Sequence, residues 1–169
     1  MQWLPASVTL PQPALDQLGS ALAMALSADE RWLVISNENG QTVILNLANS
    51  QARVILNDAG VYQVAFSRDG QYLFTNTWDQ PIRQWAVSTG ELVRWFENTN
   101  STNFAVSPDG RTLATSDQNG ALRFWEVETG APISAVAAHS NAAWKLAFSA
   151  DGRQLFTQGD GFIKFWVAP

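Results

Sequence analysis

The chain has 169 residues, of which 46% are hydrophobic, 11% are aromatic and only 15% are charged, and its formal net charge is −5. This length and composition suit one folded domain with a sizeable core and argue against disorder. The acidic balance argues against nucleic-acid and membrane partners, and the absence of cysteine excludes disulfides and cysteine-ligated zinc.

The most apolar stretch near the N-terminus covers residues 15–26. It carries Asp16 and has no basic segment before it, which argues against a secretory signal peptide. No run in the sequence approaches the roughly 20 apolar residues needed to span a bilayer. We therefore expect a cytoplasmic protein.

One four-residue phrase returns along the chain at a nearly constant spacing. Ser-x-Asp-Gly occupies residues 67–70, 107–110 and 149–152, and a weaker copy occupies 27–30, so successive serines are 40, 40 and 42 residues apart. A period in this range indicates a repeat architecture in which each unit packs mainly against its neighbours. The phrase is also a turn signal, because aspartate bonds nearby backbone N–H groups and glycine tolerates positive φ.

The second repeat unit shows the expected strands most clearly. The alternating residues 61–66 predict a half-buried strand, and residues 72–75, 82–87 and 91–96 predict three more. The other units follow the same pattern. We assign the four units to residues 21–56, 61–96, 102–136 and 139–169. Four short antiparallel strands per unit, without a helical stretch, predict the blades of an all-β propeller.

The repeated phrases resemble those of WD40 repeats. A first strand of that family ends in Ala-Phe-Ser-x-Asp-Gly, as residues 65–70 do, and its third strand carries Ile-Lys-x-Trp, as residues 163–166 do. The resemblance covers residues 21–169. It implies a WD40-like β-propeller with four blades of four antiparallel strands, acting as a rigid, non-catalytic scaffold for protein recognition.

The resemblance also implies a hydrogen-bonded set of His, Ser or Thr, Asp and Trp inside each blade. Such a set would satisfy buried polar groups and fix the strand register. The residues so assigned are His139, Thr157, Asp160 and Trp166 in unit four, Thr75, Asp79 and Trp85 in unit two, and Thr115 and Trp125 in unit three. The first unit lacks the network, and the fourth has all of it.

The two ends of the chain are one strand out of phase with the repeat. Trp166 closes the third strand of unit four, so this unit lacks a fourth strand. Residues 3–10, before unit one, occupy the place of a fourth strand. We expect this N-terminal strand to complete a last blade, which would remove an exposed sheet edge.

Four blades are few for units of this kind, because closing them into one ring requires steep angles between neighbours. We therefore expect two chains to form an eight-bladed ring as a homodimer, with the N-terminal strands exchanged. The alternatives are a compact four-bladed monomer and half of a larger ring that another chain completes.

His139 is the only histidine, so one chain cannot form a multi-histidine metal site. Together with Ser140 and Asp160 it suggests a hydrolase, but the resemblance places His139 in the blade network, where it would be buried and inert. Turn formation explains the aspartates of the repeated phrase. We predict no catalytic, cofactor-binding or metal-binding residues.

Tryptophans outside the repeat positions suggest a contact surface. Trp78 lies in a loop where a small polar residue is commoner, and Trp144 lies at the entry of a first strand, toward the face that WD40 propellers use for binding. Tryptophan is enriched at interface hot spots, because it buries a large area and keeps a polar group. The candidate surface consists of Trp144, Trp78, Asn98, Asn100, Thr102 and Asn141.

The interpretation we favour is a scaffold that assembles with itself and binds an unidentified protein. A propeller that binds carbohydrate or another small ligand would instead use aromatic and asparagine-rich pockets. A chain built or selected mainly to assemble, with no native partner, is the remaining alternative.

Overall fold

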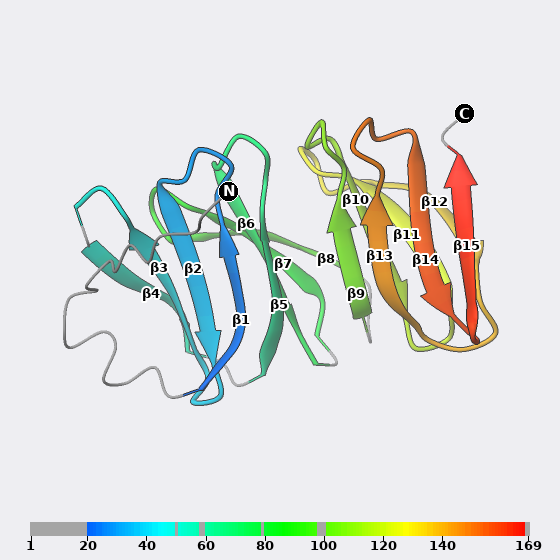
Figure 1. Cartoon of the computed structure of the whole chain (residues 1–169), viewed down its shortest axis with the longest axis horizontal. Helices are drawn as coiled ribbons and strands as arrows, with labels where there is room; N and C mark the ends of the chain where they lie inside the picture. The colour runs from blue at the N-terminus through cyan, green and yellow to red at the C-terminus, as the bar shows by residue number, and fades with distance from the viewer. Residues whose placement is uncertain (1–19, 50, 58–59, 79, 98–100, 168–169) are drawn as a thin grey trace, which may run out of the picture.

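The computed structural model describes residues 20–49, 51–57, 60–78, 80–97 and 101–167. Within these residues, fifteen β-strands form four antiparallel sheets and no helix is present (Figure 1). The prediction of an all-β fold built from four repeated sheets is confirmed. The described residues therefore include no helix that could cross a membrane.

Each sheet follows the chain order of its strands, and we call the four sheets blades 1 to 4. Blade 1 contains β1 (Ala21–Leu26), β2 (Trp32–Asn37), β3 (Gln41–Asn46) and β4 (Gln51–Asn57). Blade 2 contains β5 (Val61–Phe66), β6 (Tyr72–Thr77), β7 (Ile82–Ala86) and β8 (Leu92–Phe96). Blade 3 contains β9 (Ser101–Val106), β10 (Thr112–Asp117), β11 (Ala121–Glu126) and β12 (Pro132–Ala137).

Blade 4 has three described strands, β13 (Ala143–Phe148), β14 (Gln154–Gly159) and β15 (Phe162–Val167). The predicted closing strand at residues 3–10 lies outside the described residues, so it stays a prediction.

The first strands of the four blades lie next to one another in chain order, along the inner side of an arc. Contacts join β1 to β5, β5 to β9 and β9 to β13. The remaining strands of blade 1 extend to the left in Figure 1, and those of blade 4 extend to the right. Blades 1 and 4 are therefore the two ends of the arc.

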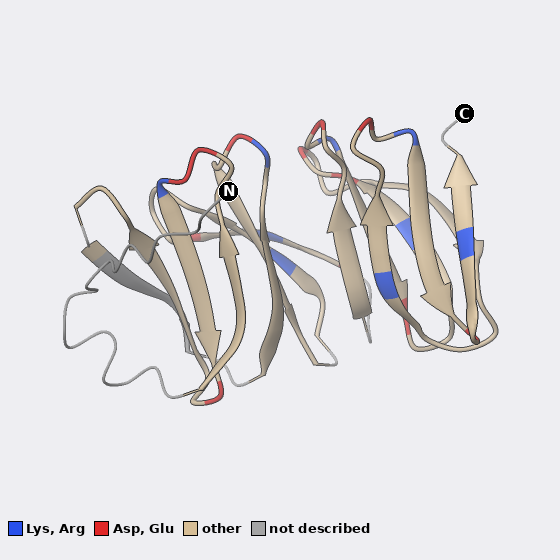
Figure 2. Cartoon of the chain, viewed as in Figure 1, with Lys and Arg blue, Asp and Glu red and all other residues tan. Residues whose placement is uncertain are grey.

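The repeated Ser-x-Asp-Gly phrase forms the same turn between the first two strands of every blade. In blade 2 the Ser67 hydroxyl donates to Asp69 Oδ1 at 2.6 Å, the Gln71 N–H donates to Asp69 Oδ1, and the Tyr72 N–H donates to Ser67 Oγ. Gly70 has a φ of 68°, in the left-handed region that favours glycine. Figure 2 shows charged residues gathered at these turns, at the upper end of the blades.

The weaker copy of the phrase in blade 1 places Glu30 at the glycine position, with a φ of 58°. We expect Glu30→Gly to raise the free energy of unfolding by about 1 kcal/mol. A residue with a Cβ is destabilised by roughly 1–2 kcal/mol in this region, and glycine removes this strain. Part of the gain is offset because glycine loses more conformational entropy on folding. Gly110→Ala, at the equivalent position of blade 3 with a φ of 74°, should have the opposite sign. Urea unfolding of both variants is the measurement, and equal signs would contradict the strain argument.

Hydrophobic side chains fill the space between successive blades in three clusters. Blades 1 and 2 enclose Val34, Ile44, Val64, Leu73 and Trp85; blades 2 and 3 enclose Phe74, Ile82, Phe104, Leu113 and Trp125; blades 3 and 4 enclose Ala114, Leu122 and Leu155, with Phe124, Leu146 and Trp166 partly buried. Blades 1 to 3 therefore each have a forward face, which packs on the next blade in the chain, and blades 2 to 4 each have a backward face, which packs on the preceding one. We use the same two names for the corresponding faces of blade 4 and blade 1 at the ends of the arc.

Candidate functional site

Three aromatic side chains from two blades meet at one end of the inner strands, and we call them the aromatic cluster. The rings of Trp78 and Trp144 are stacked, with centroids 6.2 Å apart and an interplanar angle of 19°. The ring of Tyr62 lies 5.5 Å from that of Trp78, tilted by 59°. Tyr62 and Trp78 belong to blade 2 and Trp144 belongs to blade 4, so the cluster bridges over the inner strand of blade 3.

Hydrogen bonds to that inner strand hold the cluster in place. The Tyr62 hydroxyl lies 3.0 Å from the carbonyl oxygen of Ser101 and 3.3 Å from that of Thr102, within donating distance of both. The Asn103 side-chain amide donates to the carbonyl oxygen of Trp144 at 2.9 Å. The Tyr62 side chain and the backbone of Trp144 are thus both attached to β9.

The cluster is open to solvent. Trp78 is 54% exposed and Trp144 is 47% exposed, although both are large and mostly apolar. Because Trp144 lies near the start of β13 and the Ser-x-Asp-Gly turn follows the end of that strand, the cluster lies at the opposite end of the blades from the charged turns. An ordered, solvent-exposed group of stacked aromatic rings is suited to bury apolar surface of another molecule.

The structure brings together two of the six residues predicted for the contact surface, Trp78 and Trp144. Asn141 is exposed nearby in the chain, and its N–H donates to Asp160 Oδ1 at 2.9 Å. The prediction for Thr102 is wrong: it is only 3% exposed, because its hydroxyl donates to the carbonyl oxygen of Ala143 at 2.7 Å in the space between two inner strands. Asn98 and Asn100 lie outside the described residues.

Sequence reasoning missed Tyr62. It lies five residues before Ser67, and Trp144 lies five residues before Ser149, so the two occupy the same position of the repeat. Aligning the units on their turn serines would have revealed this pair. Because a tyrosine in an alternating strand also reads as ordinary packing, periodicity alone did not single it out.

The four residues assigned to the network of blade 4 lie together. His139 Nε2 is 2.8 Å from Thr157 Oγ1, and Trp166 Nε1 donates to the same hydroxyl at 3.1 Å. His139 Nδ1 is 3.6 Å from Asp160 Oδ2, beyond hydrogen-bond distance. Asp160 instead accepts the N–H of Ser140 at 2.5 Å, and this bond is the main reason why its pKa is lowered below the usual value.

In blades 2 and 3 the Trp–Thr part of the network is present. Trp85 Nε1 donates to Thr75 Oγ1 at 2.9 Å, and Trp125 Nε1 donates to Thr115 Oγ1 at 3.0 Å. Asp79, the third residue assigned in blade 2, lies outside the described residues. The network therefore joins the second and third strands of each of these blades.

The hydrolase alternative finds little support in the position of His139. Its imidazole is buried: Nε2 faces the buried hydroxyl of Thr157, and Nδ1 is buried without a hydrogen-bond partner among the described residues, so neither nitrogen lies beside an accessible nucleophile. Within the part of the chain that the structure describes, no group of three or more His, Asp or Glu side chains is placed to hold a metal ion.

Antiparallel sheets repeated around an arc, each packed face to face on the next, define a β-propeller built from repeats. The chain belongs to the WD40 family, since the family model described as "WD domain, G-beta repeat" matches residues 51–85, 91–126 and 130–167. The predicted resemblance is thus confirmed. Domains of this family generally act as scaffolds for protein interaction.

Among solved structures, the chain is similar to the β-propeller domain of Cps50 (Swd1) from Myceliophteria thermophila, with a TM-score of 0.79 and 14% sequence identity. The match covers 88% of this chain and 52% of the other, so the chain spans about half the length of that propeller domain. At this identity the likeness concerns the fold. No curated protein matches the sequence.

Proposed function

We propose that the chain is a non-catalytic scaffold that binds a partner protein through the aromatic cluster of Tyr62, Trp78 and Trp144. The observation that carries this proposal is the pair of stacked tryptophans, each about half exposed, of which Trp78 directly follows β6 and Trp144 lies on β13. Tryptophans that are held in place before binding lose little conformational freedom when a partner covers them. Such rings contribute a large share of the binding free energy from a small contact area.

Trp144→Ala tests the site. We expect it to abolish capture of a partner protein from a cell extract, with at least a tenfold loss of affinity for the captured partner, since truncation of an interface tryptophan costs about 2 kcal/mol or more. Trp95→Ala is the matched control, because Trp95 is 56% exposed on β8 and belongs to no aromatic pair among the described residues.

Equal losses for the two variants would contradict the assignment of the aromatic cluster. Binding on a glycan array that depends on Trp144 would favour the carbohydrate-binding alternative instead.

We further propose that a second copy of the chain completes the ring. Large apolar side chains are exposed on both ends of the arc, namely Leu22, Met24 and Leu26 on β1 and Ile163, Phe165 and Val167 on β15. Contiguous apolar surface of this kind marks a contact site in soluble proteins. Blade 4 also has an edge strand, β15, to which a fourth strand such as the predicted residues 3–10 would add.

The mass in solution tests the assembly. We expect light scattering after size exclusion to give twice the 18.5 kDa of one chain. A mass of one chain at every concentration would contradict the two-chain ring and favour the compact monomer or completion by a different chain.

A further inference from the structure

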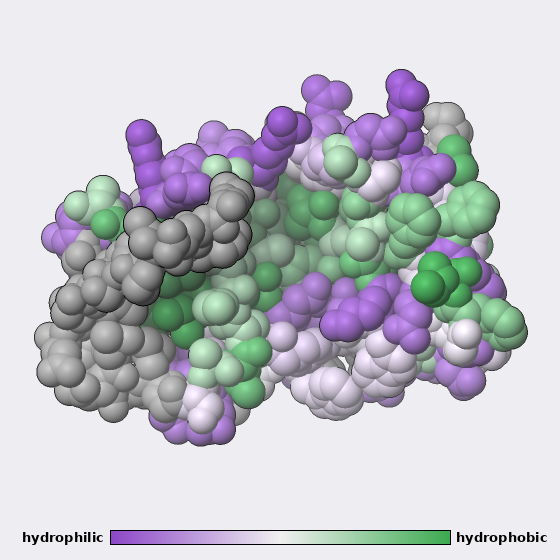
Figure 3. Space-filling model, viewed as in Figure 1, coloured by the Kyte–Doolittle hydropathy of each residue, from purple (hydrophilic) through white to green (hydrophobic). Residues whose placement is uncertain are grey.

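The forward face of blade 4 repeats the features that other blades bury. Every blade has a leucine at the same position of its second strand, Leu73 in blade 2 and Leu155 in blade 4, which we call the repeat leucine. The residue directly after it is Phe74 in blade 2, which is fully buried, and Phe156 in blade 4, which is exposed. The residue three places before the repeat tryptophan is Ile82 or Leu122 in blades 2 and 3, both fully buried, but Ile163 in blade 4 is 73% exposed. Figure 3 shows apolar side chains gathered at the right-hand edge, over β15.

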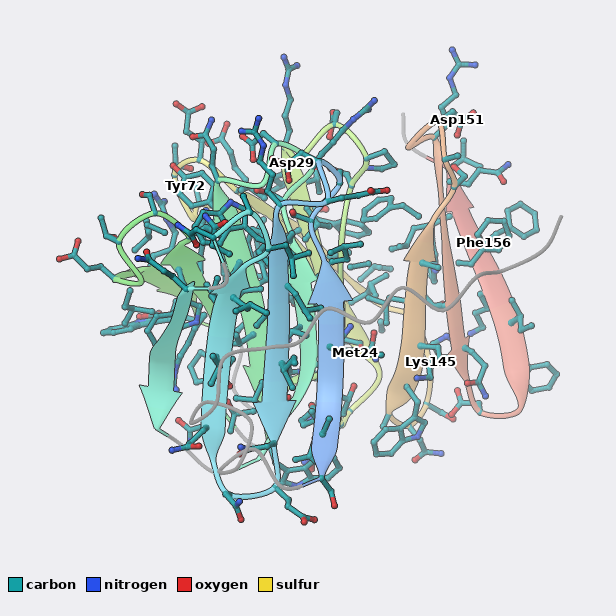
Figure 4. All side chains as sticks on the ribbon, turned by 60° about the vertical axis from the view of Figure 1, so that its left-hand side comes forward. Met24, Asp29, Tyr72, Lys145, Asp151 and Phe156 are labelled. Carbon is teal, nitrogen blue, oxygen red and sulfur yellow. The ribbon has the colours of Figure 1, made fainter. Side chains whose placement is uncertain are left out.

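The backward face of blade 1 shows the complementary pattern. Three residues before the turn serine stand Val64, Phe104 and Leu146 in blades 2, 3 and 4, and all three pack in the cluster shared with the preceding blade. The same position in blade 1 is Met24, which is 72% exposed. Figure 4 labels Met24 on blade 1 and Phe156 on blade 4. Both end faces therefore carry the side chains of a blade-to-blade contact.

Polar side chains at equivalent positions of the inner strands make hydrogen bonds to the next blade. The Gln63 side-chain amide donates to the carbonyl oxygen of Phe104 in the next blade at 2.8 Å, and the Asn103 amide donates to that of Trp144 at 2.9 Å. The equivalent residue of blade 4, four places before the turn serine, is Lys145, a donor on the exposed inner strand β13 (Figure 4).

A second set of equivalent residues, on the second strands, includes Gln158 of blade 4. Ser36 Oγ donates to the carbonyl oxygen of Val61 in the next blade at 2.8 Å, and Ser116 Oγ donates to that of Ala143 at 2.8 Å. Gln158 occupies this position in blade 4, three places after the repeat leucine, and is exposed.

The forward face of blade 4 thus offers two hydrogen-bond donors, Lys145 at a position where blades 2 and 3 bond to the backbone of the following first strand, and Gln158 at a position where blades 1 and 3 do so. Ala23 in blade 1 has no side-chain donor at the first position, and the buried Asn76 side chain in blade 2 makes no such bond at the second within the described part of the chain.

We propose that the forward face of blade 4 packs on the backward face of blade 1 of a second copy, with Phe165 and Ile163 against Met24 and Leu26. This inference rests on the two-chain ring proposed above and specifies its contact. Every forward face inside the chain packs on a backward face, and among the described residues the one backward face without a blade on it is that of blade 1. Two copies related by a twofold axis form this head-to-tail contact twice and leave neither face exposed.

Charged substitutions on the two faces test this contact. Met24→Arg alters the backward face of blade 1, and Phe165→Glu alters the forward face of blade 4. The Phe165 side chain is 66% exposed. Since the ring contains two copies, each variant alone places an unpaired charge in both of its contacts. A buried unpaired charge is strongly unfavourable, so both contacts are weakened. We expect each to have the mass of one chain by light scattering, with an unchanged circular dichroism spectrum. Val93→Glu, an exposed apolar position on β8 in the middle of the arc, is the control and should keep the wild-type mass.

Mixing the two variants distinguishes head-to-tail contact from contact between like faces. A mixed pair has one unaltered contact and one that joins Arg to Glu, so an equimolar mixture should regain the mass of two chains. The double variant Met24→Arg with Phe165→Glu should regain it as well.

Three results overturn the inference. They are a wild-type dimer that both single variants keep, monomeric variants that stay monomeric when mixed, and loss of the dimer in Val93→Glu alone. A wild-type chain that is monomeric at every concentration would overturn the two-chain ring itself, which separates the failure of that proposal from the failure of this one.

Discussion

Gly120→Ala should lower the free energy of unfolding by about 4 kcal/mol, combining roughly 1–2 kcal/mol for the left-handed backbone with 1–3 kcal/mol or more for overpacking. Gly120 has a φ of 76°, and a Cβ there would lie 2.2 Å from the carbonyl oxygen of His139 and 2.4 Å from that of Asn141. Both contacts are to backbone, which cannot rotate away. The Gly120 carbonyl also accepts the N–H groups of Ala138 and His139 at 3.0 Å. This glycine therefore joins the turn before β11 to the segment that leads into blade 4.

Gly161→Ala is the matched control for that substitution. Gly161 has the same φ of 76°, but a Cβ there would have no atom within 4 Å. We expect a loss of about 1 kcal/mol, which is the backbone cost alone. Urea unfolding at one fixed protein concentration compares the two, since the stability of an assembling protein depends on concentration. Equal losses would contradict the role of the contact between Gly120 and residues 139–141.

The sequence predicted the blades because each carries local signals that agree with one another. The turn at Ser67 and Asp69 forms within five residues, and the alternation of β5 sets which side chains face a neighbouring blade. The network of blade 4 was predictable only through the resemblance to WD40 repeats, because His139 and Thr157 are 18 residues apart in sequence and nothing local joins them.

The aromatic cluster was predicted only in part, for a physical reason. Tyr62, Thr102 and Trp144 occupy the same repeat position, but their environments differ, because Thr102 is short enough to bond between two inner strands while the larger rings extend beyond them. Side-chain size in relation to the space between blades decides this, and such spacing is a property of the assembled arc.

Thr157→Val should cost about 3 kcal/mol, because removing one partner of a buried hydrogen bond costs roughly 1–3 kcal/mol and this hydroxyl has two partners. Thr157 is buried and its Oγ1 contacts both His139 Nε2 and Trp166 Nε1. Valine has nearly the same shape, so the loss reports hydrogen bonds and not packing. Thr157→Ser keeps the hydroxyl and should cost only about 1 kcal/mol for the lost methyl group.

Thr75→Val in blade 2 separates the contribution of the histidine. Thr75 is also fully buried, and among the described residues its hydroxyl accepts one hydrogen bond from a side chain, that of Trp85 Nε1. We expect this variant to cost about 1.5 kcal/mol, half the loss at Thr157. Urea unfolding gives both values, and a cost at Thr75 equal to or above that at Thr157 would contradict a stabilising role for His139. If the larger loss at Thr157 is observed, His139 stabilises blade 4 from within, next to the face that we propose meets the second copy.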